Sequence, residues 1–505
     1  MDMMKDLSRR CFLRASAALI ACLTPAARLF AVPVERVINV TLSQAHKGTL
    51  EIDTMLLDSF GKLPDNIRQF YFDARAVFAA DAKADFTDPK IIQAATKHGM
   101  ALMGGPMLGD LKSDGVTIWL RPAKVQDLTV KVSEQGKADG KIFQVAAAKP
   151  GIESRIRIDG LSPRTKYAYS VYVAGNRVAG GMFKTAPKDN DKCDFRVAFG
   201  TCFHKIGLHN PNLMREVLKR EPSAMMIYGD IAVDDRNNEI NMHRADYQLR
   251  DVSKAWRDLA ANVPLYTSWD DHDYFDNDLS GIPRRFNAAD RDAVRAVWHQ
   301  NWNNPPADDG RVGIYHSTRM GPIELIMLDT RSCRDGGRRT EHGAYLGKAQ
   351  MDWLKNTLRD STAPFKVITS GTMWSDYVSN GKDSWGTWDT KGRDEVFDFI
   401  EQENIAGVLL LSGDRHGARA FKIPRENSYD LLEFEPATLG GVPGPGAMVK
   451  NCPEQLFGYH GNGFIAFGEF TFNTTPDTPT VTFRLIKETG DVLEEHAFSL
   501  NQLSN

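Results

Sequence analysis

Two different hydrophobic patterns divide the chain at a short polar stretch near residue 190. Before it, apolar and polar residues alternate over short runs such as 116–121, 128–132 and 154–158. Such alternation predicts strands with one face buried and the other in solvent. After it, the apolar runs are nearly continuous, which is typical of strands buried on both faces. The pattern therefore predicts a β-rich front domain followed by an α/β domain.

The front domain, expected over residues 35–187, has a sequence typical of a β-sandwich. A leucine and a proline-bearing turn within 160–166 precede Tyr167, which opens another strand. This arrangement resembles the tyrosine corner of immunoglobulin-like and fibronectin-type sandwiches. Residues 50–105 are more helical, and no role is predicted for them. The sandwich is expected to be a structural cap on the second domain rather than a ligand-binding module.

The second domain, expected over residues 194–505, alternates buried strands with helices. The predicted strands cover residues 196–199, 225–228, 325–328, 365–368 and 408–411. Helices are predicted at 211–220 and 349–358. In a layered α/β domain with helices outside the sheets, polar residues that follow the strands gather at one edge. The functional site is therefore expected where these strands end.

Composition and charge narrow the class of protein. The 505 residues are 42% hydrophobic and 25% charged, with a mean hydropathy of -0.37, which excludes disordered chains and polytopic membrane proteins. Lys and Arg total 62 and Asp and Glu total 65, a net charge of -3, so a nucleic acid is not expected as a stable partner. Six cysteines are too few for a disulfide scaffold.

Residues 1–31 have the features of an export signal. Arg9 and Arg10 precede a short apolar run over 15–23. A paired arginine before such a run is typical of a twin-arginine signal peptide, and the run is too short to be a transmembrane anchor. The end of this run also resembles a lipoprotein box, which would leave Cys22 as a lipid anchor. We expect a periplasmic or secreted protein that uses the twin-arginine export machinery, with an envelope lipoprotein as the alternative.

Acidic, histidine and cysteine side chains follow five consecutive buried strands. They are Cys202; Asp230 with Asp234 and Asp235; Asp270, Asp271, His272 and Asp273; Asp329; and Asp414 with His416. So many carboxylates in one cleft would repel one another and raise one another's pKa unless bound cations neutralised them. Asp, His and cysteine thiolate are all competent metal ligands. A metal centre at this edge is therefore predicted.

The order of these motifs resembles the PhoD-like alkaline phosphatases, a branch of the calcineurin-like metallophosphoesterases. The motifs that carry the resemblance are a strand ending in Cys202, Gly-Asp at 229–230, Trp-Asp-Asp-His at 269–272 and Ser-Gly-Asp-x-His at 412–416. A single Gly-Asp is a weak signal, whereas the ordered set is specific. The resemblance implies an α/β fold with an N-terminal β-sandwich and a layered αββα metallophosphoesterase domain.

The resemblance also implies roles for individual residues. The implied metal ligands are Cys202, Asp230, Asp271, Asp414 and His416. Asp230 would bridge two metals, and His272 would be the catalytic histidine that protonates the leaving oxygen. The implied reaction is hydrolysis of phosphomonoesters or phosphodiesters by metal-bound hydroxide, in which two metal ions polarise the phosphoryl oxygen.

Val233 departs from the family pattern, which has an iron-binding tyrosine at this position. Either the iron site is altered, or Asp234 or Asp235 substitutes, or the protein is a metal variant. The expected cofactors are two or more metal ions, iron and calcium by resemblance, with zinc or manganese as alternatives. If catalysis has been lost, the alternative function is a non-catalytic envelope binding protein that retains the scaffold. A phospholipase D-like diesterase is a third alternative.

Several neighbours are expected either to contact the phosphate-ester substrate or to support the metal ligands. They are Asp234, Asp270, Asn277, Arg331 and Arg415. A structural pairing of Arg331 with Asp329 is favoured over substrate binding, and Asn277 is expected either to cap a turn or to touch a metal. The histidines expected to be surface or loop residues are His204, His209, His243 and His460.

Overall fold

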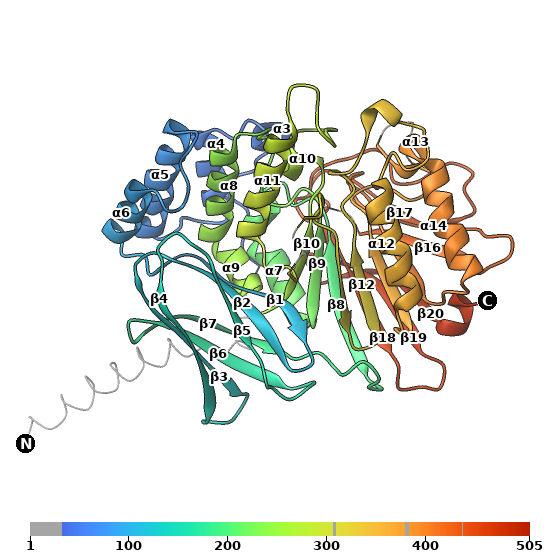
Figure 1. Cartoon of the computed structure of the whole chain (residues 1–505), viewed down its shortest axis with the longest axis horizontal. Coiled ribbons are helices and arrows are strands. Elements are labelled where there is room, and N and C mark those ends of the chain that lie inside the picture. Colours follow the sequence, from blue (N-terminus) through green and yellow to red (C-terminus); the bar gives the residue numbers. More distant parts are fainter. Residues whose placement is uncertain (1–32, 307–309, 379–382, 437) are drawn as a thin grey trace, which may run out of the picture.

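The computed structural model of the chain describes residues 33–306, 310–378, 383–436 and 438–505 (Figure 1). The predicted twin-arginine signal and the alternative lipid anchor at Cys22 lie outside the described residues. A search of the described helices finds none that is both long enough and apolar enough to cross a membrane. Element labels follow Figure 1.

The first of two large sheets has the strand order β10-β9-β8-β18-β19-β20. Its strands are β8 (Asp194–Gly200), β9 (Ala224–Tyr228), β10 (Leu265–Ser268), β18 (Ala466–Asn473), β19 (Thr480–Lys487) and β20 (Val492–Ser499). The strands β8, β9 and β10 run parallel to one another, whereas β18 is antiparallel to β8 and to β19. The parallel half of this sheet therefore ends its strands at one common edge.

The second large sheet has the strand order β11-β12-β13-β14-β16-β15-β17. Its strands are β11 (His316–Met320), β12 (Ile323–Met327), β13 (Phe365–Thr369), β14 (Val408–Leu411), β15 (Ala418–Ile423), β16 (Leu431–Pro436) and β17 (Gln455–Tyr459). The central strands β12, β13, β14 and β16 are parallel. The parallel strands of both sheets thus end at the edge where the sequence predicts the metal-binding residues.

The near-continuous apolar runs are explained by burial on both faces. In β9, Met225 and Ile227 pack toward the outer helices, whereas Met226 and Tyr228 pack into the core between the sheets. In β14, Leu410 faces outer helices in the same way. Strands of this kind need no polar face, because neither side meets water. The predicted layered αββα architecture is therefore confirmed.

Helices cover the outer face of each sheet (Figure 1). Those beside the first sheet are α7 (Pro211–Lys219), α8 (Ile240–Val252), α9 (Lys254–Ala260) and α11 (Ala288–Asn301); those beside the second are α12 (Gly347–Asp360) and α14 (Thr390–Gln402). Two single turns, α10 (Asp271–Tyr274) and α13 (Trp385–Trp388), follow strands, and 3₁₀ turns lie at Gly207–His209, Gly336–Arg338 and Leu500–Leu503. The short α10 carries two of the predicted site residues.

The front region contains the predicted β-sandwich. One sheet has the order β1-β2-β5 and the other β4-β3-β6-β7. The strands are β1 (Leu102–Lys112), β2 (Gly115–Pro122), β3 (Gln126–Glu134), β4 (Gly140–Ala148), β5 (Ser154–Ile158), β6 (Lys166–Val173) and β7 (Asn176–Lys184). The hydroxyl of Tyr167 accepts a hydrogen bond from the Ser162 N–H at 3.0 Å, five residues upstream. This is the geometry of a tyrosine corner.

Among residues 33–101, which the structure describes, four helices precede the sandwich and pack against the layered domain. They are α3 (Leu42–Ala45), α4 (Leu50–Asp58), α5 (Asp65–Ala80) and α6 (Pro89–Lys97). Helix α5 lies against α8, and the apolar side chains of this helical segment share one core with the helices of the first large sheet. Farther upstream, Val34 exchanges two backbone hydrogen bonds with the side chain of Asn212, at 2.9 and 2.8 Å. The segment between the predicted export signal and the sandwich is thus joined to the layered domain.

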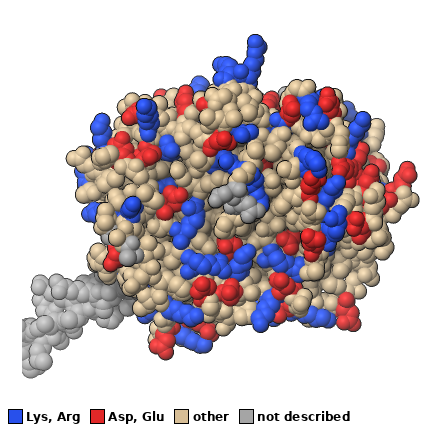
Figure 2. Space-filling model, in the orientation of Figure 1, with Lys and Arg blue, Asp and Glu red and all other residues tan. Residues whose placement is uncertain are grey.

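The charged side chains do not form a single basic face. In the view of Figure 2, lysine and arginine are interspersed with aspartate and glutamate. A surface of mixed sign agrees with the nearly balanced composition. Any strong local field must therefore arise inside the site rather than from the visible face as a whole.

Candidate metal centre and active site

The predicted site residues lie at the ends of strands from both large sheets. Cys202 follows β8, Asp230 follows β9, and Asp271 follows β10, while Asp414 and His416 follow β14 of the second sheet. Each of the five belongs to a group of potential metal-binding side chains whose ligand atoms lie within 4.8 Å of one another. The parallel strands explain this convergence, because their carboxyl ends meet at one edge.

Backbone strain is concentrated in these loops. Cys202, Asp230, Asp414 and His416 have φ angles of 55°, 53°, 70° and 51°. Residues other than glycine rarely adopt this left-handed conformation, which costs free energy. The surrounding structure holds the strained turns in place, and strain of this kind is typical of functional sites.

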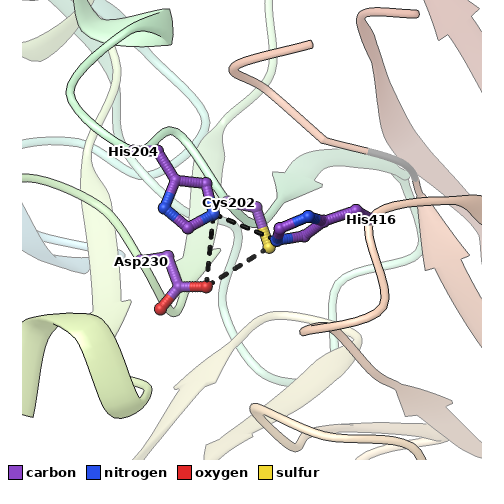
Figure 3. A group of neighbouring side chains, drawn as sticks. All are labelled: Cys202, His204, Asp230 and His416. Atoms are coloured by element: carbon purple, nitrogen blue, oxygen red, sulfur yellow. Dashed lines mark hydrogen bonds and ion pairs between the residues drawn. The ribbon is translucent and has the colours of Figure 1, made fainter. Parts of the chain in front are cut away.

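The first group contains Cys202, His204, Asp230 and His416 (Figure 3). The Nε2 atoms of His204 and His416 are 3.0 Å apart. Oδ2 of Asp230 lies 3.6 Å from both the Cys202 sulfur and the His204 Nε2. All four side chains therefore direct a donor atom toward one small space. A thiolate, two imidazoles and a carboxylate form a donor set suited to zinc or iron.

The two histidines of this group are oriented by their other ring nitrogen. Nδ1 of His204 lies 3.3 Å from Oδ1 of Asp234, and Nδ1 of His416 lies 3.3 Å from the Pro443 carbonyl oxygen. A hydrogen bond at Nδ1 leaves the Nε2 lone pair available, which is the usual arrangement of metal-binding histidines. Burial lowers the pKa of both His204 and His416, so both rings favour the neutral form that binds metals.

The second group is rich in carboxylates. Asp270, Asp271 and Asp414 lie together, and Asp230 and Asp271 also lie close to His272. Burial, followed by the charges of Asp271 and Asp270, raises the pKa of Asp414 well above its usual value. Burial and the neighbouring aspartates likewise raise the pKa of Asp230, and burial raises the pKa of Asp270 to about 6. Cations in this cleft would relieve the repulsion.

Arg331 is the buried countercharge of the second group. Its guanidinium contacts Asp270, lies 3.5 Å from Asp271 and lies 2.5 Å from Asp383. The favoured pairing of the guanidinium with Asp329 is therefore wrong. The Asp329 carboxylate is already occupied by backbone and side-chain donors, including the Arg331 N–H and the Trp269 indole, each at 2.9 Å. The guanidinium of Arg331 thus pairs with Asp270, Asp271 and Asp383.

His272 lies beside the carboxylates with its ring held by Asp235. Its Nδ1 is 2.6 Å from Oδ1 of Asp235. Burial opposes a charged imidazole, but Asp271, Asp230 and the bond to Asp235 together raise the pKa of His272 well above its usual value. These contacts favour the cationic form of the ring, which has a proton on both nitrogens. This is the state that a general acid requires.

Asp273 supports the loop that carries Asp230. Its carboxylate accepts hydrogen bonds from the N–H groups of Ile231 at 3.0 Å, Ala232 at 3.2 Å and Val233 at 3.4 Å. The side chain of Val233 is fully buried in the core beside the first sheet. Replacement of the family tyrosine by Asp234 or Asp235 was one of three alternatives, and neither aspartate belongs to the potential metal groups of the described residues. His204 completes the first group instead.

The remaining predicted residues lie at the margin. Asn277 is exposed, and its side chain donates to Asp278 at 3.0 Å, so it belongs to none of the potential metal groups among the described residues. Arg415 lies 3.8 Å from the Asp414 carboxylate, and its buried Nε has no hydrogen-bond partner within the described parts of the chain. Of the two, only Arg415 is placed to reach a ligand in the cleft.

The expectation of surface or loop positions is wrong for His209 and His243, which lie in helices, whereas His204 lies in a loop but is buried. His204, His209 and His243 are buried, and only His460 is exposed. The Cys-x-His spacing of Cys202 and His204, together with Val233, was the signal that could have identified His204. His46 also lies in the site, with its ring centroid 4.5 Å from that of His272. No sequence pattern points to His46, because it is far from every motif.

Comparison with known proteins agrees with this architecture. Residues 215–440 match the family model described as PhoD-like phosphatase. This part of the chain is thus similar to the PhoD-like phosphatases. Residues 99–189, which include most of the sandwich, match a model described as a domain of unknown function (DUF7800). The PhoD-like match includes Asp230, Asp271, His272, Asp414 and His416 but begins after Cys202 and His204.

Relatives of the PhoD-like domain are phosphatases by name. The chain is 23% identical to alkaline phosphatase D of Bacillus subtilis over 385 residues, covering 63% of this chain and 64% of that protein. A solved structure of PhoD has a TM-score of 0.65 at 19% identity and covers 80% of this chain and 91% of that chain. A purple acid phosphatase from yellow lupin (Lupinus luteus) seeds has a TM-score of 0.57 at 12% identity, covering 78% and 74%. Both solved structures therefore have the same overall fold as this chain.

Proposed function

We propose that the protein is a metal-dependent phosphohydrolase that cleaves phosphomonoesters or phosphodiesters. The observation that carries the proposal is the convergence of two donor groups on the shared carboxylate of Asp230. Asp230 forms one group with Cys202, His204 and His416 and another with Asp271 and His272. A carboxylate between two donor sets is suited to bridge two cations. The phosphatase names of the relatives support the same reaction class.

The residues present fit metal ions. Oδ1 of Asp230 and Oδ2 of Asp270 are buried and accept no hydrogen bond from any described residue. Burial and the charge of Asp230 raise the pKa of the Cys202 thiol, so its thiolate needs a cation beside it. We infer that one ion is held by Cys202, His204, Asp230 and His416, and a second by Asp230, Asp270, Asp271 and Asp414. Such ions would act as Lewis acids toward a phosphoryl oxygen and would activate water as the nucleophile.

His272 supplies the proton in this proposal. Asp235 holds its Nδ1, so the proton that leaves the protein is the one on Nε2. The departing alkoxide of a phosphate ester needs a proton, and a positioned imidazolium lowers the barrier for its departure. Burial of His272 keeps the proton from exchanging freely with bulk water. The side chain is therefore suited to protonate the leaving oxygen while the carboxylates hold the cations.

The test is hydrolysis of a chromogenic phosphate monoester by two variants. Asp230→Asn removes the shared negative charge and should lower the metal content below that of the wild type, which we expect to be about two ions per chain. His272→Ala should keep the metals but lower kcat by about 10²–10⁴-fold, because it removes the general acid. Elemental analysis and circular dichroism would accompany the rates.

Matched controls separate these effects from general damage. Asp477→Asn and His460→Ala make the same chemical changes at exposed positions and should leave the rate unchanged. Full activity in both Asp230→Asn and His272→Ala would overturn the mechanism. A bis-ester substrate measured beside the monoester would separate a phosphodiesterase from a monoesterase and would test the phospholipase D-like alternative.

Val233 gives no reason to prefer a non-catalytic binding protein. Its side chain packs in the core, and His204 provides a donor in the first group. We further propose that the enzyme is exported to the periplasm or beyond, and the support for this is the paired arginine at Arg9 and Arg10.

A further inference from the structure

His46 reaches the site from a part of the chain that neither family match covers. It follows α3 directly, whereas the two matches begin at residues 99 and 215. Its Nδ1 lies 3.1 Å from Oδ2 of Asp235, the carboxylate whose Oδ1 holds His272. The two rings are 4.5 Å apart and inclined by 33°. One carboxylate therefore aligns two imidazoles side by side.

The other ring nitrogen of His46 is buried without a partner among the described residues. Nε2 makes no hydrogen bond to them, although the side chain is only 22% exposed. The rings of His46, His204 and His272 each bring a nitrogen to within 4.8 Å of the others. A buried polar atom without a partner costs free energy, so native structures rarely leave one unless a ligand or water satisfies it. Nε2 of His46 is thus placed to meet a ligand beside His204 and His272.

The turn that carries His46 is fastened to the loop that carries Asp235. The carbonyl oxygen of Gly48 accepts hydrogen bonds from Nη2 of Arg236 at 3.2 Å and from Nη2 of Arg75 at 2.7 Å. Arg236 is itself held by two bonds of 2.8 Å to Asp246. His46 is therefore held twice. Asp235 binds its side chain, and Arg236 binds the backbone of Gly48, two residues after it.

We propose that His46 is a substrate-binding residue whose ring is doubly protonated, so that Nδ1–H donates to Asp235 and Nε2–H donates a hydrogen bond to a phosphoryl oxygen beside His272. This assignment rests on the proposed phosphohydrolase function. A phosphoryl group offers several acceptor oxygens, so two aligned imidazoles can bind one group together. A metal ion is the competing ligand, because His46, His204 and His272 also form a potential metal-binding group of the described residues. The metal content of the His46 variant decides between the two ligands.

The test measures binding of inorganic phosphate to the metal-loaded full-length protein by calorimetry. His46→Gln should weaken phosphate binding by about tenfold or more, as expected for the loss of a hydrogen bond to a charged group. The metal content should stay at the wild-type value. The matched control is His98→Gln, because His98 lies in the same helical segment but pairs with Asp73 at 2.8 Å, away from the site. That variant should bind phosphate like the wild type.

The outcomes separate the competing explanations. Unchanged phosphate affinity in His46→Gln would overturn the assignment, and so would a loss of bound metal, which would make His46 a metal ligand. His46→Asn, checked by thermal unfolding, provides a second variant if the first is poorly folded. If the wild type neither binds phosphate nor hydrolyses esters, the proposed function fails and this assignment fails with it. If the wild type hydrolyses esters and the His46→Gln variant binds phosphate as tightly as the wild type, only the assignment of His46 is contradicted, and the proposed function stands.

Discussion

Asp234 and Asp235 are adjacent in sequence but support different side chains. Asp234 is fully buried and lies against Nδ1 of His204. Asp235 has a φ of 53°, which turns the chain so that its carboxylate reaches His272 and His46 instead. One aspartate thus supports the first metal group, and the other supports the imidazoles that we assign to the substrate.

This division predicts different losses for two neighbouring substitutions. Asp234→Asn should weaken metal binding by about tenfold or more, because removing the acceptor charge lowers the basicity of the ligating histidine. Asp235→Asn should keep the metals and instead weaken phosphate binding and lower kcat. Metal titration and phosphate calorimetry on both variants would check this. Identical losses in the two variants would contradict the division.

At the scale of single residues, the sequence predicted the motif ligands but not all of their neighbours. Asp230, Asp271 and Asp414 follow apolar strands in a fixed order, and that order identifies them. His204 was missed because a histidine in a loop has no periodicity to mark it as buried. The partner of Arg331 was also missed, since three carboxylates from separate loops meet only after folding.

At the scale of elements, Gly48 ends the turn that carries His46. Its φ is 53°, and a Cβ atom there would overlap the guanidinium of Arg236. Arg236 cannot easily move away, because it is nearly buried and bound twice by Asp246. The close approach of the backbone to Arg236 therefore requires glycine.

Substitution of Gly48 should displace the turn without touching the metals. Gly48→Ala should lower the free energy of unfolding by about 1–3 kcal/mol and should weaken phosphate binding while metal content is kept. Gly61→Ala is the matched control, because Gly61 has a φ of 106° in the same segment, yet a Cβ atom there would meet no described atom within 4 Å. Gly61→Ala should lower the free energy of unfolding but leave phosphate binding unchanged. Equal phosphate affinity in Gly48→Ala and the wild type would show that the turn does not position His46.

The elements themselves were predictable from the sequence only in part. In the two large sheets, the strands whose ranges were predicted were β8, β9, β12, β13 and β14, whose apolar runs are bounded by polar loops and turns. No range was predicted for the strands β10, β11 and β15 to β20. The packing position of α3 to α6 was not predictable. The sequence pattern shows that a helix has an apolar face, but it does not show which other element that face packs against. Helix α5 packs on α8, which lies much later in the chain, and joins the core of the first sheet.

At the scale of the whole molecule, three buried histidines should make stability sensitive to acid. Burial lowers the pKa of His209 to about 3 and those of His243 and His316 to about 4. In the unfolded chain a histidine has a pKa of about 6.5. The stabilisation is therefore present above about pH 6.5 and is lost as the pH falls toward about 4, because the unfolded state binds the protons first.

His209→Leu should reduce this dependence. We expect the free energy of unfolding of the wild type to fall between about pH 7 and pH 5, and the variant to lose about 2 kcal/mol less. Urea unfolding at several pH values, with metal concentration fixed, measures both. The exposed control His460→Ala should follow the wild type. A steeper loss in His209→Leu than in the wild type would reverse the sign and contradict the argument.

The anchoring of Val34 to Asn212 bears on how the amino terminus of the protein should be checked. Only a short segment separates this anchor from His46, and the predicted export signal ends just before it. Removal of that predicted signal would leave the new amino terminus on the segment that carries His46. Further trimming past His46 would remove the side chain that we assign to phosphate binding while leaving Cys202, Asp230, Asp414 and His416 in place. The intact mass of the purified protein should therefore be measured together with its metal content.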